Sequence, residues 1–253
     1  MLKKRIIPVL LLKNGRMVKG TNFSKYRDTG NPKTAVRIYS AQDADELVFI
    51  DIERNKETKN ELLKTIEIAA SECFMPLTAG GGVSNLEDVR NLINAGADKV
   101  LINTAAYENT KFVKDVVMEF GSQCVVIGID YKLQNKDLVV FTNCGTKNTN
   151  LSLFEYVMSV QNLGIGEIFL NSIDLDGTMK GYDIKTVKKI SKKILLPLIV
   201  SGGAGNFSHL ADVFKLTDAS AAACGSLFHF GDNNPIRARS YLKNQKIPMR
   251  KLK

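Results

Sequence analysis

The sequence predicts a single (βα)8 barrel of the α/β class, a TIM barrel with an internal half-barrel repeat. Short, nearly continuous apolar runs alternate with polar segments of helical periodicity, which is the pattern of a parallel sheet buried on both faces. Eight such runs in 253 residues allow about 32 residues for each βα unit, the size expected of this barrel. Sequence motifs also recur after about half of the chain.

The eight apolar runs are the predicted barrel strands. They are Arg5–Leu11, Glu46–Ile52, Met75–Ala79, Lys99–Asn103, Cys124–Asp130, Glu167–Asn171, Leu196–Ser201 and Ala219–Cys224. Helical spacing predicts helices over residues 85–95, 110–120, 151–163 and 184–193. Residues 131–143 predict a hairpin that turns at Gln134-Asn135-Lys136. The alternative is a doubly wound open sheet, but Leu12-Lys13-Asn14-Gly15 replaces the glycine-rich phosphate loop that usually follows its first strand.

Three pairs of segments repeat in the same order at an offset near 120 residues. MPLTAGGGVSNLEDV (75–89) resembles LPLIVSGGAGNFSHLADV (196–213), ELVFIDI (46–52) resembles EIFLNSI (167–173), and RIIPVLLL (5–12) resembles CVVIGIDY (124–131). The period predicts one domain over residues 1–253, made of half-barrels at about 1–122 and 123–253. Chance similarity between glycine-rich turns is the alternative.

The net charge of +9 does not indicate a nucleic-acid-binding face, because the basic residues concentrate at the two ends of the sequence. Residues 1–20 hold six Lys/Arg and residues 233–253 hold seven, without an acidic residue in either segment. The remainder carries 22 basic and 26 acidic residues, and tryptophan is absent. We therefore expect no nucleic-acid partner.

Cysteine spacing and hydropathy favour a cytoplasmic protein without a metal site, cofactor or membrane partner. The four cysteines (Cys73, Cys124, Cys144 and Cys224) lie far apart and form no CxxC pair. His209 and His229 are 20 residues apart and have no cysteine at metal-ligand spacing. No apolar run approaches the ~20 residues of a membrane-spanning helix, and the run Ile6–Leu12 predicts a strand rather than a signal peptide.

The carboxyl ends of the barrel strands, here called the mouth, are expected to hold the active site. Alternation along each strand directs position 11, Asn103, Asp130, Asn171 and Ser201 to this mouth. Asp130 is the only carboxylate among them, and burial would raise its pKa and suit it to acid–base catalysis. A turn aspartate is the alternative. The half-barrel repeat pairs Asp130 with Leu11, so one member of a two-carboxylate site is missing.

Two glycine-rich turns precede predicted helices, and backbone N–H groups at such turns bind phosphate. The first anion cradle is predicted at Gly82, Asn103 and Thr104, after the third and fourth strands. The second anion cradle is predicted at Gly203, Gly225 and Ser226, after the seventh and eighth strands. Together they predict a small ligand with two phosphates. Tight turns without a ligand are the alternative.

The segment Lys13–Gly20 is long, basic and predicted to be a loop after the first strand. This composition is typical either of a mobile lid whose lysine, Lys19, binds a phosphate group, or of a solvated run of charged residues.

At the amino ends of the strands, here called the floor, four charged residues share the inward-facing parity. They are Arg5, Glu46, Lys99 and Glu167, called the charged ring below. Their charges cancel, so mutual pairing is expected, because buried charges require partners. The ring fits a structural plug or a gate on an internal passage.

These features resemble the cyclase subunit of imidazole glycerol phosphate synthase over nearly the whole chain. The stretches that carry the resemblance are KRIIPVL, GRMVKGTNF, RDTGNP, DELVFIDI, LTAGGGV, DKVLINTAA, SIDLDGTMKGYD, SGGAGNF and GSLFHF. The resemblance implies a lyase/cyclase-type subunit in a heterodimer with a glutaminase that docks on the floor. Ammonia would cross the barrel and react at the mouth with a bisphosphorylated ribulosyl–carboxamide.

The resemblance also implies roles for individual residues. The charged ring becomes the ammonia gate, Asp98 part of the partner interface, and Gly177 part of phosphate binding. Lys19 becomes the lid lysine, and the substrate site includes Asp51, Asn171, Asp176 and Ser201. Of the family's two catalytic aspartates, Asp130 is present, whereas position 11 is leucine. Asn171 and Cys144 replace hydroxyl side chains that the family usually has.

Leu11 separates the functional hypotheses. The first hypothesis is an ammonia-channelling subunit that supplies a sugar amidotransferase. That enzyme would carry out nucleotide-sugar amidation in surface-polysaccharide or flagellin-glycan synthesis. Such a subunit tolerates the loss of cyclisation. A working cyclase of histidine biosynthesis must function despite Leu11. A related phosphosugar isomerase would also need a carboxylate at position 11, and a phosphate-ligand sensor would not need the charged ring.

Overall fold

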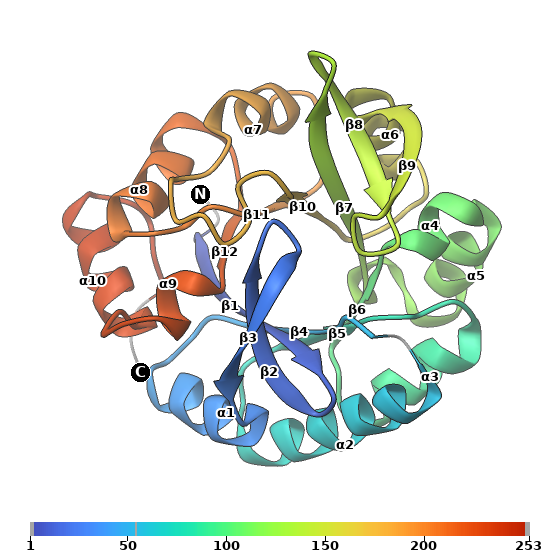
Figure 1. The fold of residues 1–253 in the computed structure, drawn as a ribbon, viewed down its shortest axis with the longest axis horizontal. Coiled ribbons are helices and arrows are strands. Elements are labelled where there is room, and N and C mark those ends of the chain that lie inside the picture. The colour runs from blue at the N-terminus through green and yellow to red at the C-terminus, as the bar shows by residue number, and fades with distance from the viewer. Residues whose placement is uncertain (1–2, 54, 251–253) are drawn as a thin grey trace.

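The computed structural model describes residues 3–53 and 55–250, and within them eight parallel strands close into a barrel (Figure 1). Around the ring each strand pairs with the next, and the last pairs back with the first. In ring order they are β1 (Arg5–Lys13), β4 (Leu47–Asp51), β5 (Leu77–Gly80), β6 (Lys99–Ile102), β7 (Val125–Gln134), β10 (Glu167–Ser172), β11 (Leu198–Ser201) and β12 (Ala221–Cys224). The predicted fold and all eight predicted strands are confirmed.

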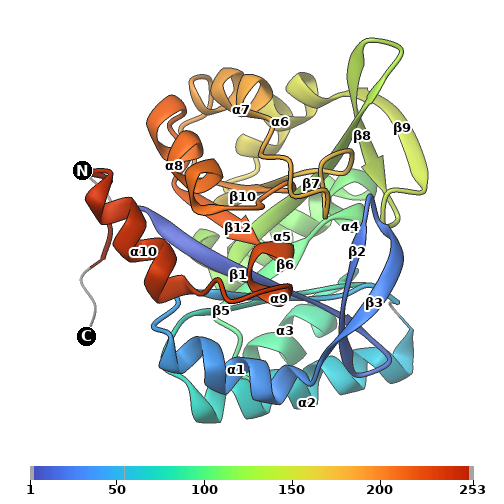
Figure 2. The same ribbon diagram turned by 60° about the vertical axis from the view of Figure 1, so that its left-hand side comes forward.

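Helices surround the barrel on its outside (Figures 1 and 2). They are α1 (Pro32–Ala41), α2 (Lys56–Glu72), α3 (Leu86–Asn94), α4 (Thr104–Glu108), α5 (Thr110–Phe120), α6 (Leu153–Gln161), α7 (Ile184–Ser191), α8 (Phe207–Leu216), α9 (Ser226–His229) and α10 (Pro235–Asn244), with a 3-10 turn at Ser122–Cys124. The four predicted helices correspond to α3, α5, α6 and α7. Among the described residues no helix is long and apolar enough to span a bilayer.

Asparagine residues cap the amino ends of several of these helices. Asn55, Asn85, Asn109, Asn206 and Asn234 each accept a hydrogen bond from the backbone N–H three residues later. This contact satisfies one of the amide groups that a helix start leaves without a partner, and it stabilises a helix by about 1 kcal/mol. The caps therefore determine where the chain turns from the mouth into each helix.

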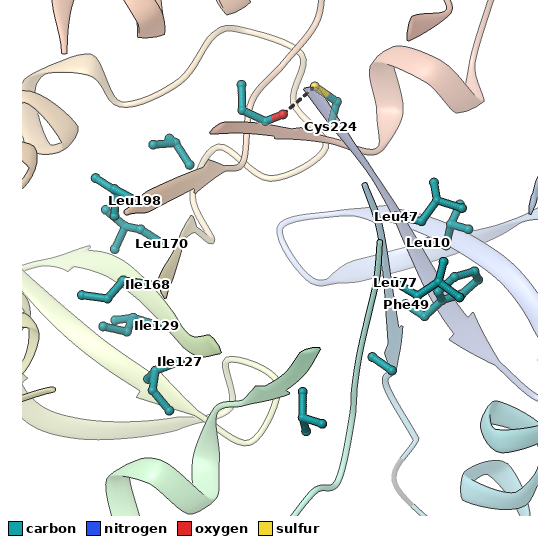
Figure 3. Packing of buried hydrophobic residues seen from close by; sticks show 14 of the residues in the cluster. Leu10, Leu47, Phe49, Leu77, Ile127, Ile129, Ile168, Leu170, Leu198 and Cys224 are labelled. Carbon is teal, nitrogen blue, oxygen red and sulfur yellow. Dashed lines mark hydrogen bonds between the residues drawn. The ribbon is translucent and has the colours of Figure 1, made fainter. Parts of the chain in front are cut away.

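The strands bury two separate apolar layers. Side chains that point out of the barrel pack beneath the helices, and Figure 3 shows Ile127, Ile129, Ile168 and Leu170 of neighbouring strands grouped in this layer. Side chains that point inward form a smaller cluster, which includes Ile7, Val9, Val48, Leu101, Val126, Phe169, Ile199, Ala221 and Ala223. The second layer lines the barrel interior between floor and mouth.

Four further strands lie outside the barrel and form two antiparallel extensions at the mouth. They are β2 (Arg16–Thr21), β3 (Ser24–Gly30), β8 (Asp137–Thr142) and β9 (Lys147–Ser152). The predicted hairpin over 131–143 is confirmed, with Asn135 and Lys136 at its turn in left-handed conformations (φ 48° and 76°). The strand β9 extends this hairpin and was not predicted.

The prediction of a loop over Lys13–Gly20 is wrong. Strand β1 continues to Lys13, turns at Asn14 and Gly15 with φ 48° and 67°, and returns as β2. Two residues with positive φ are the signature of the tight hairpin turn that Asn-Gly favours. The segment is therefore a β-ribbon rather than a loop, and its role as a mobile lid stays a prediction. The division into half-barrels stays a prediction.

Candidate functional site at the barrel mouth

A cavity of about 530 Å³ opens at the mouth, where the predicted site residues converge. Its walls include the ends of the barrel strands, and Phe23 and Tyr26 of the β2–β3 ribbon also line it. This volume is within the range of small-molecule sites. Burial raises the pKa of Tyr26 to about 12, and the negative groups nearby act in the same direction.

Asp130 lies at this mouth between two amide side chains. Asn103 Nδ2 donates to one carboxylate oxygen at 2.7 Å, and Asn171 Nδ2 donates to the other at 3.1 Å. Burial raises the pKa of Asp130 to about 6, although the hydrogen bonds from both amides oppose the shift. A carboxyl group of this pKa exchanges a proton readily near neutral pH.

Leu11 lines the same cavity from the other side of the barrel. Three strands separate its strand, β1, from the Asp130 strand, β7, in either direction around the ring. Leu11 packs against the inward-facing apolar cluster and continues it to the cavity wall. The wall opposite Asp130 therefore offers no proton donor or acceptor at position 11.

The residues of the first anion cradle come together at the cavity. Gly82, Asn103 and Thr104 all line it, and Gly82 has a φ of 64°. The Thr104 hydroxyl accepts a hydrogen bond from the Asn143 N–H at 3.0 Å, which ties the start of α4 to the turn after β8. The cradle is thus open to a ligand in the cavity.

The second anion cradle is covered instead. Of Gly177, Gly203, Gly225 and Ser226, only Gly225 lines the cavity, and the aliphatic part of Lys19 lies over it. Gly177 adopts φ 74° directly against the Gly20 carbonyl, where a larger side chain would collide. The Ser226 hydroxyl is buried without a hydrogen-bond partner among the described residues. Lys19 therefore lies against the one residue of this cradle that lines the cavity.

Lys19 is 5% exposed and forms an ion pair with Asp176. Its Nζ lies 2.7 Å from both carboxylate oxygens, which fixes the β2–β3 ribbon to the loop after β10. The solvated charge run is therefore wrong for Lys19. Close by, burial and the Lys19 charge lower the pKa of His229 to about 4, and neither ring nitrogen has a hydrogen-bond partner among the described residues.

The charged ring forms at the floor as a closed square. Arg5 contacts Glu46 and Glu167 at 2.8 Å, and Lys99 contacts the same two carboxylates at 3.0 Å. Thr78 Oγ1 also donates to Glu46 at 2.7 Å. Burial by itself would raise the pKa of Glu167, but hydrogen bonds and charges from Arg5 and Lys99 outweigh it and lower that pKa. The predicted mutual pairing is confirmed.

Comparison with known proteins assigns the chain to a family. Residues 5–234 match the family model described as "Histidine biosynthesis protein". The chain is also 45% identical over 251 residues to "Imidazole glycerol phosphate synthase subunit HisF" of Hydrogenobaculum sp. (strain Y04AAS1), a match covering 99% of this chain and 100% of that protein. The chain belongs to the HisF family.

The remaining predicted residues occupy different places in this HisF-family barrel. Asp51 lines the cavity, but its carboxylate accepts hydrogen bonds from the Thr58 hydroxyl at 2.7 Å and the Glu53 N–H at 2.9 Å. Ser201 ends β11 outside the cavity lining. Asp98 is exposed at the floor, where it accepts a hydrogen bond from the Leu77 N–H at 2.8 Å.

Sequence reasoning about this HisF-family chain missed two groups of residues at the mouth. These are Phe23 and Tyr26, which form part of the cavity wall, and His229. Phe23 and Tyr26 belong to a ribbon of mixed polarity without an apolar run. The signal that could have revealed it is Asn14-Gly15, because this dipeptide between extended segments indicates a hairpin. No sequence pattern indicates that His229 lies near Lys19, since 210 positions separate them. Among the described residues, no cluster of three or more His, Cys, Asp or Glu side chains could hold a metal ion.

Proposed function

We propose that this HisF-family chain is the synthase-type subunit of a glutamine-dependent complex and conducts ammonia from a glutaminase at the floor to the mouth. The charged ring supports the floor as the inlet, because it closes the barrel with side chains that can swing aside rather than with backbone. Beyond it lie the inward-facing apolar side chains. An apolar passage admits neutral ammonia and disfavours ammonium, because moving an unpaired charge out of water is costly.

We further infer that the chain's own lyase/cyclase-type activity is weak and that its ammonia serves nucleotide-sugar amidation in surface-polysaccharide or flagellin-glycan synthesis. The observation that carries this inference is Leu11, which faces the cavity where the family's second acidic group is expected. Leucine cannot transfer a proton, whereas the charged ring that serves delivery is complete. Delivery to a sugar amidotransferase needs the ring and the passage, but no acid at position 11.

The second candidate is an active imidazole glycerol phosphate synthase cyclase of histidine biosynthesis. Its support is the open first anion cradle beside Asp130, because one phosphate of a bisphosphorylated substrate would place the reacting atoms near that carboxyl group. It requires Asp130, with its pKa near 6, to serve both proton transfers.

Turnover of the bisphosphorylated ribulosyl–carboxamide with added ammonium separates the two candidates. Loss of one proton-transfer group typically slows a reaction ~10²–10⁴-fold, so we expect the unmodified chain to cyclise far below ordinary enzyme rates. A rate on the order of 1 s⁻¹ or more would instead establish the histidine-pathway function.

A further inference from the structure

Two apolar side chains on the floor are almost fully exposed. Leu195 is 98% exposed and Phe74 is 96% exposed, the highest values for large hydrophobic side chains among the described residues. Both lie in the turns that lead from a helix into a barrel strand, Phe74 before β5 and Leu195 before β11. Phenylalanine and leucine are mostly buried in folded proteins, and a partner that covers this face would remove both side chains from water.

The two side chains lie on opposite sides of the charged ring. Three strands separate β5 from β11 in either direction around the barrel, so their turns face each other across the floor. Eight strands ~4.8 Å apart and tilted by ~36° make a barrel about 15 Å across. A standard interface of ~800 Å² per partner is roughly 30 Å wide, so one partner surface can reach both turns and cover the ring between them.

Both turns hold their apolar residue on a stiff backbone. Phe74 precedes Met75-Pro76, and Leu195 precedes Leu196-Pro197. Proline fixes its own φ and restricts the residue before it, which limits the motion of each turn. The backbone of such a turn loses little conformational freedom on binding, which favours its use in an interface.

We propose that Phe74 and Leu195 are the two apolar anchors by which the glutaminase subunit seats over the charged ring and seals the ammonia inlet from water. This inference rests on the proposed function, because ammonia that enters at the ring must come from a source docked on the floor. Asp98, exposed just before β6, lies at the same end of the barrel and accepts a hydrogen bond from the Leu77 N–H of β5, the strand that follows Phe74.

The test measures binding of the full chain to the glutaminase subunit of the same organism by titration calorimetry. We expect Phe74→Ser and Leu195→Ser each to weaken binding at least ten-fold, and the double variant to weaken it further. Leu133→Ser is the matched control, since Leu133 is 62% exposed but lies on the β7–β8 hairpin at the mouth, and it should change affinity less than two-fold. Unchanged thermal unfolding shows that each variant is folded.

A second readout follows the seal itself. At glutaminase concentrations that saturate the Phe74→Ser barrel, a larger share of the ammonia from glutamine should appear in bulk solution than with the unmodified barrel. If both variants bind the glutaminase with affinities within two-fold of the unmodified chain, the proposal that Phe74 and Leu195 are anchors is overturned, while the proposed function stays intact. If the unmodified chain does not bind the glutaminase, the proposed function itself fails. Self-association that Phe74→Ser abolishes, seen by sedimentation, would overturn the proposal in favour of a second copy of the chain.

Discussion

Leu11 of β1 and Asp130 of β7 lie on opposite sides of the barrel and line the same cavity. The carboxylate of Asp130 is held by two amide donors, whereas Leu11 extends the apolar cluster of the barrel interior to the cavity wall. Of these two residues only Asp130 can ionise. The residues of the first anion cradle line the same cavity, and four ion pairs close the charged ring at the other end of the barrel.

Restoring the missing carboxylate should restore cyclisation. Leu11→Asp should raise the ammonium-dependent turnover of the bisphosphorylated cyclase substrate by at least ten-fold, because a positioned proton-transfer group typically contributes ~10²–10⁴-fold. Leu11→Asn is the matched control, because asparagine has the same shape as aspartate but no titratable proton. This variant should show no gain in turnover. Asp130→Asn in the Leu11→Asp background should abolish the gain. Equal rates for the Asp and Asn variants would show that position 11 takes no part in proton transfer.

Alternation along the strands was sufficient to predict the charged ring and four of the five mouth residues, whereas Ser201 lies outside the cavity lining. Arg5 and Leu11 lie on one strand six positions apart, so a period of two directs both inward at opposite ends of the barrel. The same period, applied to Lys99 and Glu167, predicted the ring whose contacts are 2.8–3.0 Å in the structure. The near-continuous apolar runs predicted the strands themselves.

Contacts between distant segments could not be predicted in this way. Lys19 and Asp176 are 157 positions apart, and neither lies in a periodic apolar run. Their ion pair depends on the turn at Asn14-Gly15, which sends β2 back across the mouth and places Lys19 over Gly225. Whether a glycine-rich turn is open or covered is a property of such tertiary contacts, so the sequence placed both cradles without revealing that the second is closed.

The covered second cradle predicts unequal phosphate binding. In crystals of the unmodified chain soaked in inorganic phosphate, density should appear at Gly82 and Thr104, which line the cavity. Density at Ser226 should appear only when the Lys19–Asp176 pair is weakened, as in Asp176→Asn, which keeps the shape of the side chain and removes its charge. Equal occupancy of both cradles in the unmodified chain would contradict this.

His229 should make stability depend on pH in the acid range. Its pKa is about 4 in the folded chain against an ordinary 6.5, so the unfolded chain binds the proton more tightly. The resulting stabilisation is complete above pH 6.5 and is lost as the pH falls from 6.5 through 4, by about 3 kcal/mol in the free energy of unfolding. Urea unfolding of the unmodified chain and of His229→Phe should diverge in slope over this interval. Parallel curves would show that His229 is not responsible.

The charged ring predicts a loss of stability and of ammonia coupling when one corner is neutralised. Glu46 is 1% exposed and accepts hydrogen bonds from Arg5, Lys99 and Thr78, so Glu46→Gln leaves two partly buried cations with one carboxylate. Breaking such a buried group costs about 3 kcal/mol in the free energy of unfolding. Glu119→Gln is the matched control, because the Arg90–Glu119 pair is exposed and should contribute less than about 1 kcal/mol.

The same variant tests the ring as an inlet. If the ring regulates entrance from the floor, Glu46→Gln should change product formation driven by glutamine relative to product formation driven by added ammonium, which reaches the mouth from solution. Glu119→Gln should leave that ratio unchanged. A ratio equal to that of the unmodified chain, in a Glu46→Gln variant shown to be folded and bound to its glutaminase, would reduce the ring to a structural plug. The comparison works because both assays share the chemistry at the mouth and differ only in the route of the nitrogen.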